Sequence, residues 1–202
     1  MEKMPTAGII LAAGSSSRLG RPKQLLDIGG RPLVVRTVQT ALSSLLERVV
    51  LVLGHEAEAI LASLGPLGSE PRLVVRVNSR YGEGMSTTLR EGLEQVADFP
   101  SVMVILADHP FLDYRLMDLL LTRFRSSDKD ICVPCCKGRQ GSPTIFGARF
   151  YPDIMKIRGD AGGREIIRKN PESLLRVEIE TEDSFFDIDT EEDLVHLGLT
   201  PR

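Results

Sequence analysis

Short apolar runs alternate along this chain with longer segments whose apolar residues recur at helical spacing, and this alternation limits the possible folds most strongly. The predicted strands are residues 7–12, 49–53, 73–77, 102–106 and 131–133, and the predicted helices are residues 32–46, 56–64, 85–96 and 113–124. Such short apolar runs suit strands buried on both faces of a sheet. Helical connections imply right-handed crossovers between parallel strands. We therefore expect an α/β protein with a doubly wound, three-layer, Rossmann-like fold and a mixed, mainly parallel central sheet.

Length and composition are those of an ordinary globular protein. A chain of 202 residues with 42% hydrophobic and 26% charged residues suits one α/β domain. Residues 65–71 are rich in Gly and Pro, but the alternation of strands and helices resumes directly after them. We therefore interpret them as a loop and expect a single domain over residues 1–202.

The charge balance and the apolar runs argue against several classes of partner. A formal net charge of −3 does not favour binding to nucleic acid, which needs clustered positive charge. No apolar run approaches the roughly 20 residues of a membrane-spanning helix. The N-terminus lacks the pattern of a signal peptide. We therefore expect a cytoplasmic protein without a nucleic-acid or membrane partner.

The three cysteines, Cys132, Cys135 and Cys136, lie close together in the sequence. Their odd number and clustering argue against a disulfide framework. A metal or redox site is the alternative, but no second Cys pair or His pair completes a zinc-binding pattern. We expect reduced thiols on or beside a half-buried strand.

Polar and small residues gather directly after the predicted strands. They are residues 14–23, His55, residues 78–88, residues 108–110 and, late in the chain, residues 187–189. In open α/β sheets, ligands bind beyond the carboxyl ends of the strands. The sequence therefore predicts one ligand site at this edge of the sheet.

The segment after the first strand reads Leu11-Ala-Ala-Gly-Ser-Ser-Ser-Arg-Leu-Gly-Arg-Pro-Lys23. Its small residues allow a ligand to approach the backbone closely, and Arg18 and Lys23 supply two cations for phosphate groups. It is neither a Walker A loop nor a dinucleotide fingerprint. A flexible loop with incidental basic residues is the alternative, but the position after a buried strand favours phosphate binding.

This segment resembles the signature of nucleotidyltransferases, and its Ala12-Ala13 pair looks most like the molybdenum-cofactor cytidylyltransferases. The resemblance covers nearly the whole chain. It continues through the motifs that begin at Gly84 (Gly-Met-Ser-Thr-Thr), Asp108 (Asp-His-Pro), Gly141 (Gly-Ser-Pro-Thr), Gly159 (Gly-Asp-Ala-Gly) and Asp187 (Asp-Ile-Asp-Thr). It implies a nucleotidyltransferase fold with a nucleotide-binding half at about residues 1–110 and an acceptor-binding half at about residues 111–202.

The resemblance also implies roles for individual residues. Arg18 and Lys23 would be catalytic, since they would hold the triphosphate and stabilise the leaving pyrophosphate. The nucleotide-binding set would be Ala12, Ala13, Gly14, Ser15, Arg18, Lys23, Asn78, Gly82, Ser86 and Thr88. Thr88 departs from the serine that is usual in the family. Lys137, Arg139, Arg158 and Arg164 are candidates for the acceptor side.

Asp108 and Asp189 are the expected ligands of Mg²⁺, with Mn²⁺ as an alternative, because hard cations prefer carboxylate oxygens. Asp187 would lie on the same face as Asp189 in an extended segment and support it from outside the metal's own ligands. The alternative is that Asp108 caps a helix, or that Asp189 or Thr190 caps the helix that begins near Glu191. His109 is expected to shape the pocket, because a phosphate nucleophile needs no general base.

The implied reaction transfers CMP from CTP to the phosphate of molybdenum cofactor, and a molybdenum hydroxylase apoenzyme is a possible recipient of the product. The same chemistry with GTP, or with a sugar or polyol phosphate, stays open. So does a non-catalytic chaperone of the cofactor. An NAD-binding module at Gly82-x-Gly84 is a weak alternative, because Thr87 stands where the fingerprint needs a third glycine.

Overall fold

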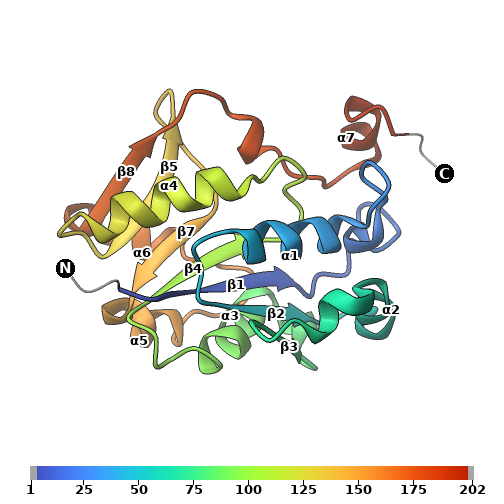
Figure 1. Cartoon of the computed structure of the whole chain (residues 1–202), viewed down its shortest axis with the longest axis horizontal. Helices are drawn as coiled ribbons and strands as arrows, with labels where there is room; N and C mark the ends of the chain where they lie inside the picture. The colour runs from blue at the N-terminus through green and yellow to red at the C-terminus, as the bar shows by residue number, and fades with distance from the viewer. Residues whose placement is uncertain (1–3, 200–202) are drawn as a thin grey trace.

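An eight-stranded mixed sheet forms the middle layer of the protein, seen in a computed structural model that describes residues 4–199 (Figure 1). Met1–Lys3, on which the signal-peptide prediction partly depends, and residues 200–202 lie outside the described residues. The strands are β1 (Thr6–Ala12), β2 (Arg48–Leu53), β3 (Leu73–Val77), β4 (Ser101–Leu106), β5 (Ile131–Cys136), β6 (Arg139–Gln140), β7 (Thr144–Gly147) and β8 (Leu174–Glu178). Their order is β3-β2-β1-β4-β7-β5-β6, and β8 pairs with β5.

The first four strands run parallel to one another, with β1 between β2 and β4. β7 then pairs antiparallel with both β4 and β5, and β8 runs parallel to β5. Polar groups that follow β1 and β4 therefore emerge at the same edge. The mixed, mainly parallel sheet is confirmed.

Helices cover both faces of the sheet, because the strands send apolar side chains to both faces. In β1, Ile9 packs on one side and Ile10 on the other, and both are fully buried. The helices α1 (Leu33–Ser43), α2 (Ala57–Ser63) and α4 (Tyr114–Arg125) cover one face. The other face is covered by α3 (Met85–Glu94), α5 (Tyr151–Ile154) and α6 (Arg164–Lys169). The three-layer, doubly wound fold is confirmed.

The elements differ from the predicted ones mainly after residue 130. Strand β5 continues to Cys136, past the predicted end at residue 133, although Pro134 lacks a ladder N–H. The loop at residues 65–71 contains a 3₁₀ helix, Gly65–Ser69. Strands β6 to β8 and helices α5 and α6 are short, so they carry little periodic signal in the sequence.

A small third apolar cluster joins the segment after β1 to the end of the chain. It contains Leu19, Leu26, Leu33, Ile188 and Leu194. Leu194 belongs to the last helix, α7 (Glu191–His196), which lies beside the segment that follows β1 in Figure 1. Packing in this cluster places the Asp187–Asp189 segment next to the loop that follows β1, which ends at Lys23 and is called the first loop below.

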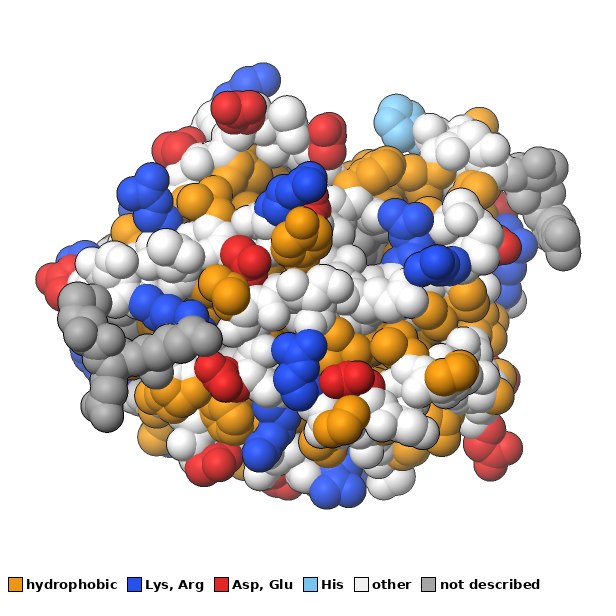
Figure 2. Space-filling model, in the orientation of Figure 1, with side chains coloured by type: hydrophobic (Ala, Val, Ile, Leu, Met, Phe, Trp, Pro, Cys, Tyr) orange, Lys and Arg blue, Asp and Glu red, His pale blue; other side chains and the backbone are white. Residues whose placement is uncertain are grey.

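The surface shows no concentration of one charge on the face drawn in Figure 2, where Lys and Arg alternate with Asp and Glu. Among residues 4–199, no helix is both long and apolar enough to cross a membrane.

Candidate functional site

The first loop leaves β1 buried at Ala12 and Ala13 and becomes exposed at Gly14. Ala12 and Ala13 are 1% and 3% exposed, whereas Gly14 and Ser15 are exposed. A Cβ added to Gly14 would meet no atom within 4 Å. Open space therefore adjoins Gly14, whereas Ala12 and Ala13, which were also expected to bind the nucleotide, are almost fully buried.

The buried side chain of Gln24 fixes the backbone of the first loop, a role that we did not predict. Its side chain is 2% exposed, and its Nε2 donates to the carbonyl oxygens of Ala12 at 3.2 Å and Gly14 at 2.9 Å. The Lys23 N–H donates to Ser16 Oγ at 3.1 Å, which adds a brace across the loop. The two hydrogens of one amide nitrogen satisfy two loop carbonyls, so the loop is preorganised. A polar residue next to Lys23 in the sequence was the available signal.

Lys23 lies between the two predicted metal ligands. Its Nζ donates to Asp108 Oδ2 at 2.6 Å, to Asp189 Oδ1 at 3.0 Å and to the Ile188 carbonyl oxygen at 3.2 Å. Arg18 approaches the same group, with its Nη2 at 3.1 Å from Asp189 Oδ2. Burial works to lower the pKa of Lys23, but the two carboxylates outweigh it and hold the pKa above its ordinary value. Lys23 is therefore charged at neutral pH.

Neither predicted metal ligand caps a helix. Asp113 caps α4, and its Oδ1 accepts a hydrogen bond from the Arg115 N–H. Thr190 caps α7 and forms a capping box with Asp193. The carboxylates of Asp108 and Asp189 are thus left to face the basic side chains of the first loop.

The pair of carboxylates fits a hard divalent cation. Asp108 Oδ1 is buried and has no hydrogen-bond partner among the described residues, and such an oxygen is suited to a metal. Within residues 4–199, no group of three or more His, Cys, Asp or Glu side chains is placed to hold a metal. Two carboxylates, one of them with an open oxygen, fit the preference of Mg²⁺ for one or two protein carboxylates completed by substrate phosphates and water.

Three of the predicted nucleotide-binding residues at the start of α3 and just after β3 are buried. Asn78, Ser86 and Thr88 are 2%, 1% and 4% exposed, whereas Gly82 is exposed. Asn78 Nδ2 donates to the hydroxyls of Thr87 and Thr88 at 2.8 and 3.1 Å. The Asn78 side chain therefore fastens the start of α3 to the end of β3.

The start of α3 is in direct contact with the loop before α6. Gly84 has a φ of 106°, and a Cβ added there would lie 2.4 Å from the Gly159 carbonyl carbon. The Ser86 N–H donates to the Gly159 carbonyl oxygen at 3.0 Å, and the Met85 N–H to Asp160 Oδ1 at 3.3 Å. Only glycine suits position 84, because of both its backbone angle and this approach.

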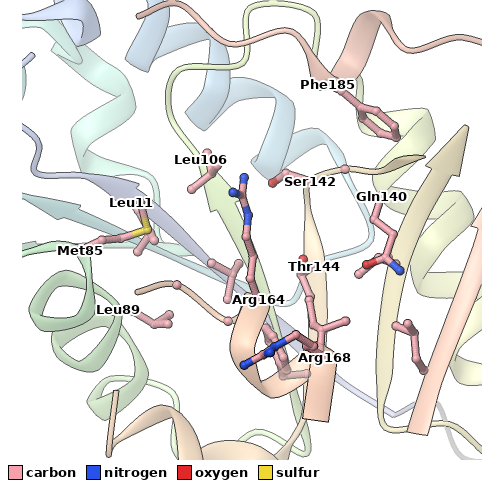
Figure 3. A pocket seen from close by; sticks show the side chains of 18 of the residues that line it. Leu11, Met85, Leu89, Leu106, Gln140, Ser142, Thr144, Arg164, Arg168 and Phe185 are labelled. Atoms are coloured by element: carbon pink, nitrogen blue, oxygen red, sulfur yellow. The ribbon is translucent and has the colours of Figure 1, made fainter. Parts of the chain in front are cut away.

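Beside this contact a cavity of about 720 Å³ opens between α3, α6, β5 and β7 (Figure 3). Leu11, Leu89 and Phe146 belong to its apolar walls. Its basic side chains are Arg139, Arg164, Arg168 and Arg176, opposed by the carboxylates of Asp160 and Asp187. Figure 3 shows Arg164 and Arg168 extending from α6 among the residues that line the cavity.

Two of the four predicted acceptor contacts line this cavity, Arg139 and Arg164. Lys137 and Arg158 are not among its lining residues, and Arg158 donates to the carbonyl oxygens of Met155 and Ile157. We did not predict Arg168 or Arg176. The spacing of Arg164 and Arg168, one helical turn apart, was a usable signal for the first of them.

His109 also lines the cavity and is 7% exposed. Its Nδ1 lies 2.9 Å from the Ser184 carbonyl oxygen, which can only accept, so Nδ1 carries the proton. His109 thereby fastens Ser184, whose neighbour Phe185 also lines the cavity, and this geometry supports our interpretation of His109 as a pocket-shaping residue.

The cysteine cluster lies within strand β5, and all three thiols are buried and unbridged. Burial raises the pKa of Cys132 to about 12, so this thiol is protonated and unreactive near neutral pH. The thiols lie on a strand, as predicted, but this strand is buried throughout and not half-buried.

Curated proteins similar to this chain carry more than one kind of name. Nicotine blue oxidoreductase of Paenarthrobacter nicotinovorans is 31% identical over 198 residues, which span 94% of this chain and 95% of that protein. A probable molybdenum cofactor guanylyltransferase of Thermococcus sibiricus is 27% identical, over 93% of this chain and 94% of that protein.

A solved structure has a similar fold, and a family model matches most of the chain. Rv0371c of Mycobacterium tuberculosis superposes with a TM-score of 0.83 at 24% identity, over 98% of each chain. The same protein has been solved in complex with manganese, and that structure superposes with a TM-score of 0.79 at 22% identity over 96% of this chain and 97% of that one. At this identity the likeness shows the fold alone. The model of the MobA-like NTP transferase domain matches residues 8–174, and this chain therefore belongs to the MobA-like NTP transferase domain family.

Proposed function

We propose that this protein is a divalent-metal-dependent nucleotidyltransferase that transfers CMP from CTP to the phosphate of molybdenum cofactor. The observation that carries the proposal is the meeting of Lys23 and Arg18 with Asp108 and Asp189 beside the arginine-lined cavity. Phosphate-binding cations, metal-binding carboxylates and a pocket for a second anionic substrate thus share one edge of the sheet.

In the proposed reaction, an oxygen of the acceptor phosphate attacks the α-phosphorus of CTP. The bond between the α-phosphorus and the bridging oxygen breaks, and pyrophosphate leaves with the electron pair. The acceptor phosphate is already ionised near neutral pH, so no side chain has to remove a proton. Catalysis then consists of positioning and charge stabilisation.

The first loop and the two carboxylates have different tasks in this scheme. The backbone of the preorganised first loop binds the nucleotide, while Arg18 and Lys23 bind its phosphates and stabilise charge on the leaving pyrophosphate. Asp108 and Asp189 would hold Mg²⁺ or Mn²⁺, which supplies positive charge to neutralise the triphosphate. The manganese complex of Rv0371c supports a divalent metal in this fold.

The cavity suits a phosphorylated heterocycle as the acceptor. Its apolar walls can cover a flat ring system, and Arg164 and Arg168 can bind a phosphate in the bidentate manner typical of guanidinium groups. These residues support a molybdopterin-type acceptor more strongly than a sugar phosphate, which would present hydroxyls to the apolar walls.

The choice of nucleotide is the least constrained part of the proposal. The Ala12-Ala13 pair favours CTP by resemblance, whereas the Thermococcus sibiricus relative is named a guanylyltransferase. GTP is therefore the main competitor. If the product is a molybdenum cofactor dinucleotide, a molybdenum hydroxylase apoenzyme is the partner that we expect to receive it.

The test combines the full chain and Mg²⁺ with each of CTP, GTP, ATP and UTP and with molybdenum cofactor, a sugar phosphate or a polyol phosphate. Pyrophosphate release with CTP and molybdenum cofactor alone would support the whole proposal. Release with GTP, or with another acceptor, would correct the substrate and retain the reaction class. Binding of cofactor without release from any pair would favour a chaperone.

A redox activity is the second candidate, because the relative from Paenarthrobacter nicotinovorans is named an oxidoreductase. Its test is the oxidation of NADH or NADPH by the full chain in the presence of a heteroaromatic acceptor. Oxidation without pyrophosphate release in the first assay would replace the proposed transferase.

A further inference from the structure

Lys23 is engaged by the two carboxylates that are proposed to bind the metal. An ammonium group has three hydrogens, and the three acceptors around Nζ are Asp108 Oδ2, Asp189 Oδ1 and the Ile188 carbonyl oxygen. The Lys23 side chain is 17% exposed and that of Asp108 is 20% exposed. The ammonium is therefore fully coordinated in a largely enclosed place.

A metal bound to Asp108 Oδ2 and Asp189 Oδ1 would need the position of this ammonium. Mg²⁺ lies about 2.0–2.1 Å from its oxygen ligands, whereas Nζ lies at 2.6 and 3.0 Å from one oxygen of each carboxylate. Two cations that share the same two oxygens would be in repulsive contact. Lys23 and a divalent cation are thus mutually exclusive at Asp108 Oδ2 and Asp189 Oδ1. Asp108 Oδ1 has no hydrogen-bond partner among the described residues and is open to a metal, but the other oxygen of Asp189 is held by Arg18, so a metal that binds both carboxylates must displace one of the two cations.

Arg18 likewise forms an ion pair with a proposed metal ligand, at the outer side of the site. Its Nη2 contacts Asp189 Oδ2 at 3.1 Å, and its side chain is 72% exposed. The two carboxylates are thereby matched by two cations from the first loop. When a metal takes the carboxylates, Lys23 and Arg18 become available to phosphate groups.

We propose that Lys23 is an exchangeable internal counter-ion, which occupies the Asp108–Asp189 site until a metal–nucleotide complex displaces it onto the phosphates. This inference rests on the metal site of the proposed function and adds an order to it. Free metal binds the protein weakly because it must displace Lys23 without offering the ammonium another partner. Nucleotide and metal therefore enter the site together.

Before a metal binds, Lys23 also keeps the two carboxylates close together. Asp108 and Asp189 would repel each other without a cation between them, and Lys23 removes this repulsion. The flexible four-carbon stem of lysine allows the ammonium to move while the Lys23 backbone stays fixed by Ser16. The loop can thus change its ionic partners without changing its fold.

The experiment measures Mn²⁺ binding to the full-length protein without nucleotide, by electron paramagnetic resonance of free Mn²⁺. Lys23→Gln removes the charge, and we expect it to bind Mn²⁺ at least about tenfold more tightly than the wild type, in keeping with loss of a partly buried ion pair. Lys23→Arg keeps a cation and is the matched control, expected to resemble the wild type. Lys23→Met replaces Lys23→Gln if that variant does not fold.

The double variant Lys23→Gln/Asp108→Asn locates the effect. It should lose the gain in affinity, because one carboxylate of the pair is gone. Unchanged or weaker Mn²⁺ binding in folded Lys23→Gln or Lys23→Met would overturn the proposed exchange. A gain in Mn²⁺ affinity that persists in the double variant would also overturn it. This readout needs no catalysis, so a protein that transfers no nucleotide could still show the exchange.

Discussion

The backbone N–H of Ile188 donates to the carbonyl oxygen of Asp108 at 3.1 Å, and this bond joins the end of β4 to the last segment of the chain. Ile188 is fully buried and packs in the small cluster with Leu19 and Leu26. Its two neighbours in the sequence, Asp187 and Asp189, are partly or fully exposed. One buried residue thus sets the distance between the carboxylates that bracket Lys23.

Loss of either phosphate-binding cation should reduce turnover sharply. We expect Lys23→Ala and Arg18→Ala to lower kcat by roughly 10²–10³-fold, the loss typical of one charge-stabilising donor. Pyrophosphate release under saturating nucleotide is the measurement. Arg31→Ala, which removes an exposed arginine bonded only to Gln39 in its described side-chain contacts, is the control. Near-wild-type turnover in both loop variants would remove the first loop from the proposed catalysis.

Asp108→Asn should abolish metal-dependent turnover and leave the fold intact. The amide is nearly isosteric with the carboxylate but carries no charge, so it is a poor ligand for a hard cation. Rates across a Mg²⁺ titration, with circular dichroism as the check on folding, measure the effect. Asp128→Asn, at a side chain that is 88% exposed, is the matched control. An unchanged Mg²⁺ dependence would remove Asp108 from the metal site.

Substitutions of Gln24 test whether its two hydrogen bonds fix the conformation of the first loop. Gln24→Leu removes both donated bonds, and Gln24→Glu removes at least one of them while keeping the shape. We expect kcat/KM for the nucleotide to fall by about 10–100-fold in both, because a small displacement of positioning groups is costly. Gln39→Leu is the control at a half-buried glutamine of α1 that bonds Arg31 instead of the loop. A loss of thermal stability with unchanged kcat/KM would show a structural role alone.

The arginines of α6 test the acceptor pocket. We expect Arg164→Gln and Arg168→Gln to raise the KM for molybdenum cofactor about tenfold or more, since each removes a charge-assisted contact to phosphate, and to leave the KM for nucleotide unchanged. Arg158→Gln should leave both values unchanged, because Arg158 does not line the cavity. Steady-state kinetics with each substrate varied in turn separates these outcomes. The reverse pattern, with only Arg158→Gln affected, would move the acceptor elsewhere.

Gly84→Ala tests the contact between the two halves of the site. The added methyl group would meet the Gly159 backbone, and the φ of 106° is unfavourable for any other residue. We expect a lower kcat/KM for both substrates, because the turn at α3 and the loop before α6 must move apart. Gly68→Ala, where an added Cβ would lie 3.8 Å from the Leu64 side chain in ordinary van der Waals contact, is the control. A variant as active as the wild type would show that the contact is dispensable.

The sequence alone determined the layered fold and the edge of the sheet that carries the site. Apolar runs and helical periodicity are local patterns, and the rule that ligands bind at the carboxyl ends of parallel strands turns them into a location. The loop from Leu11 to Lys23 and the acidic residues Asp108 and Asp189 could therefore be selected without coordinates. Their agreement with a family signature added the proposed chemistry.

Only the tertiary structure decided how these residues meet. The contact of Lys23 with Asp108 and Asp189 joins positions separated by 85 and 166 residues, and no local pattern encodes such a distance. The same holds for Gln24 beneath the loop and for Gly84 against Gly159. Packing of Ile188 into its cluster brings the end of the chain to its beginning, because burial of apolar surface acts between residues however far apart they lie in the sequence.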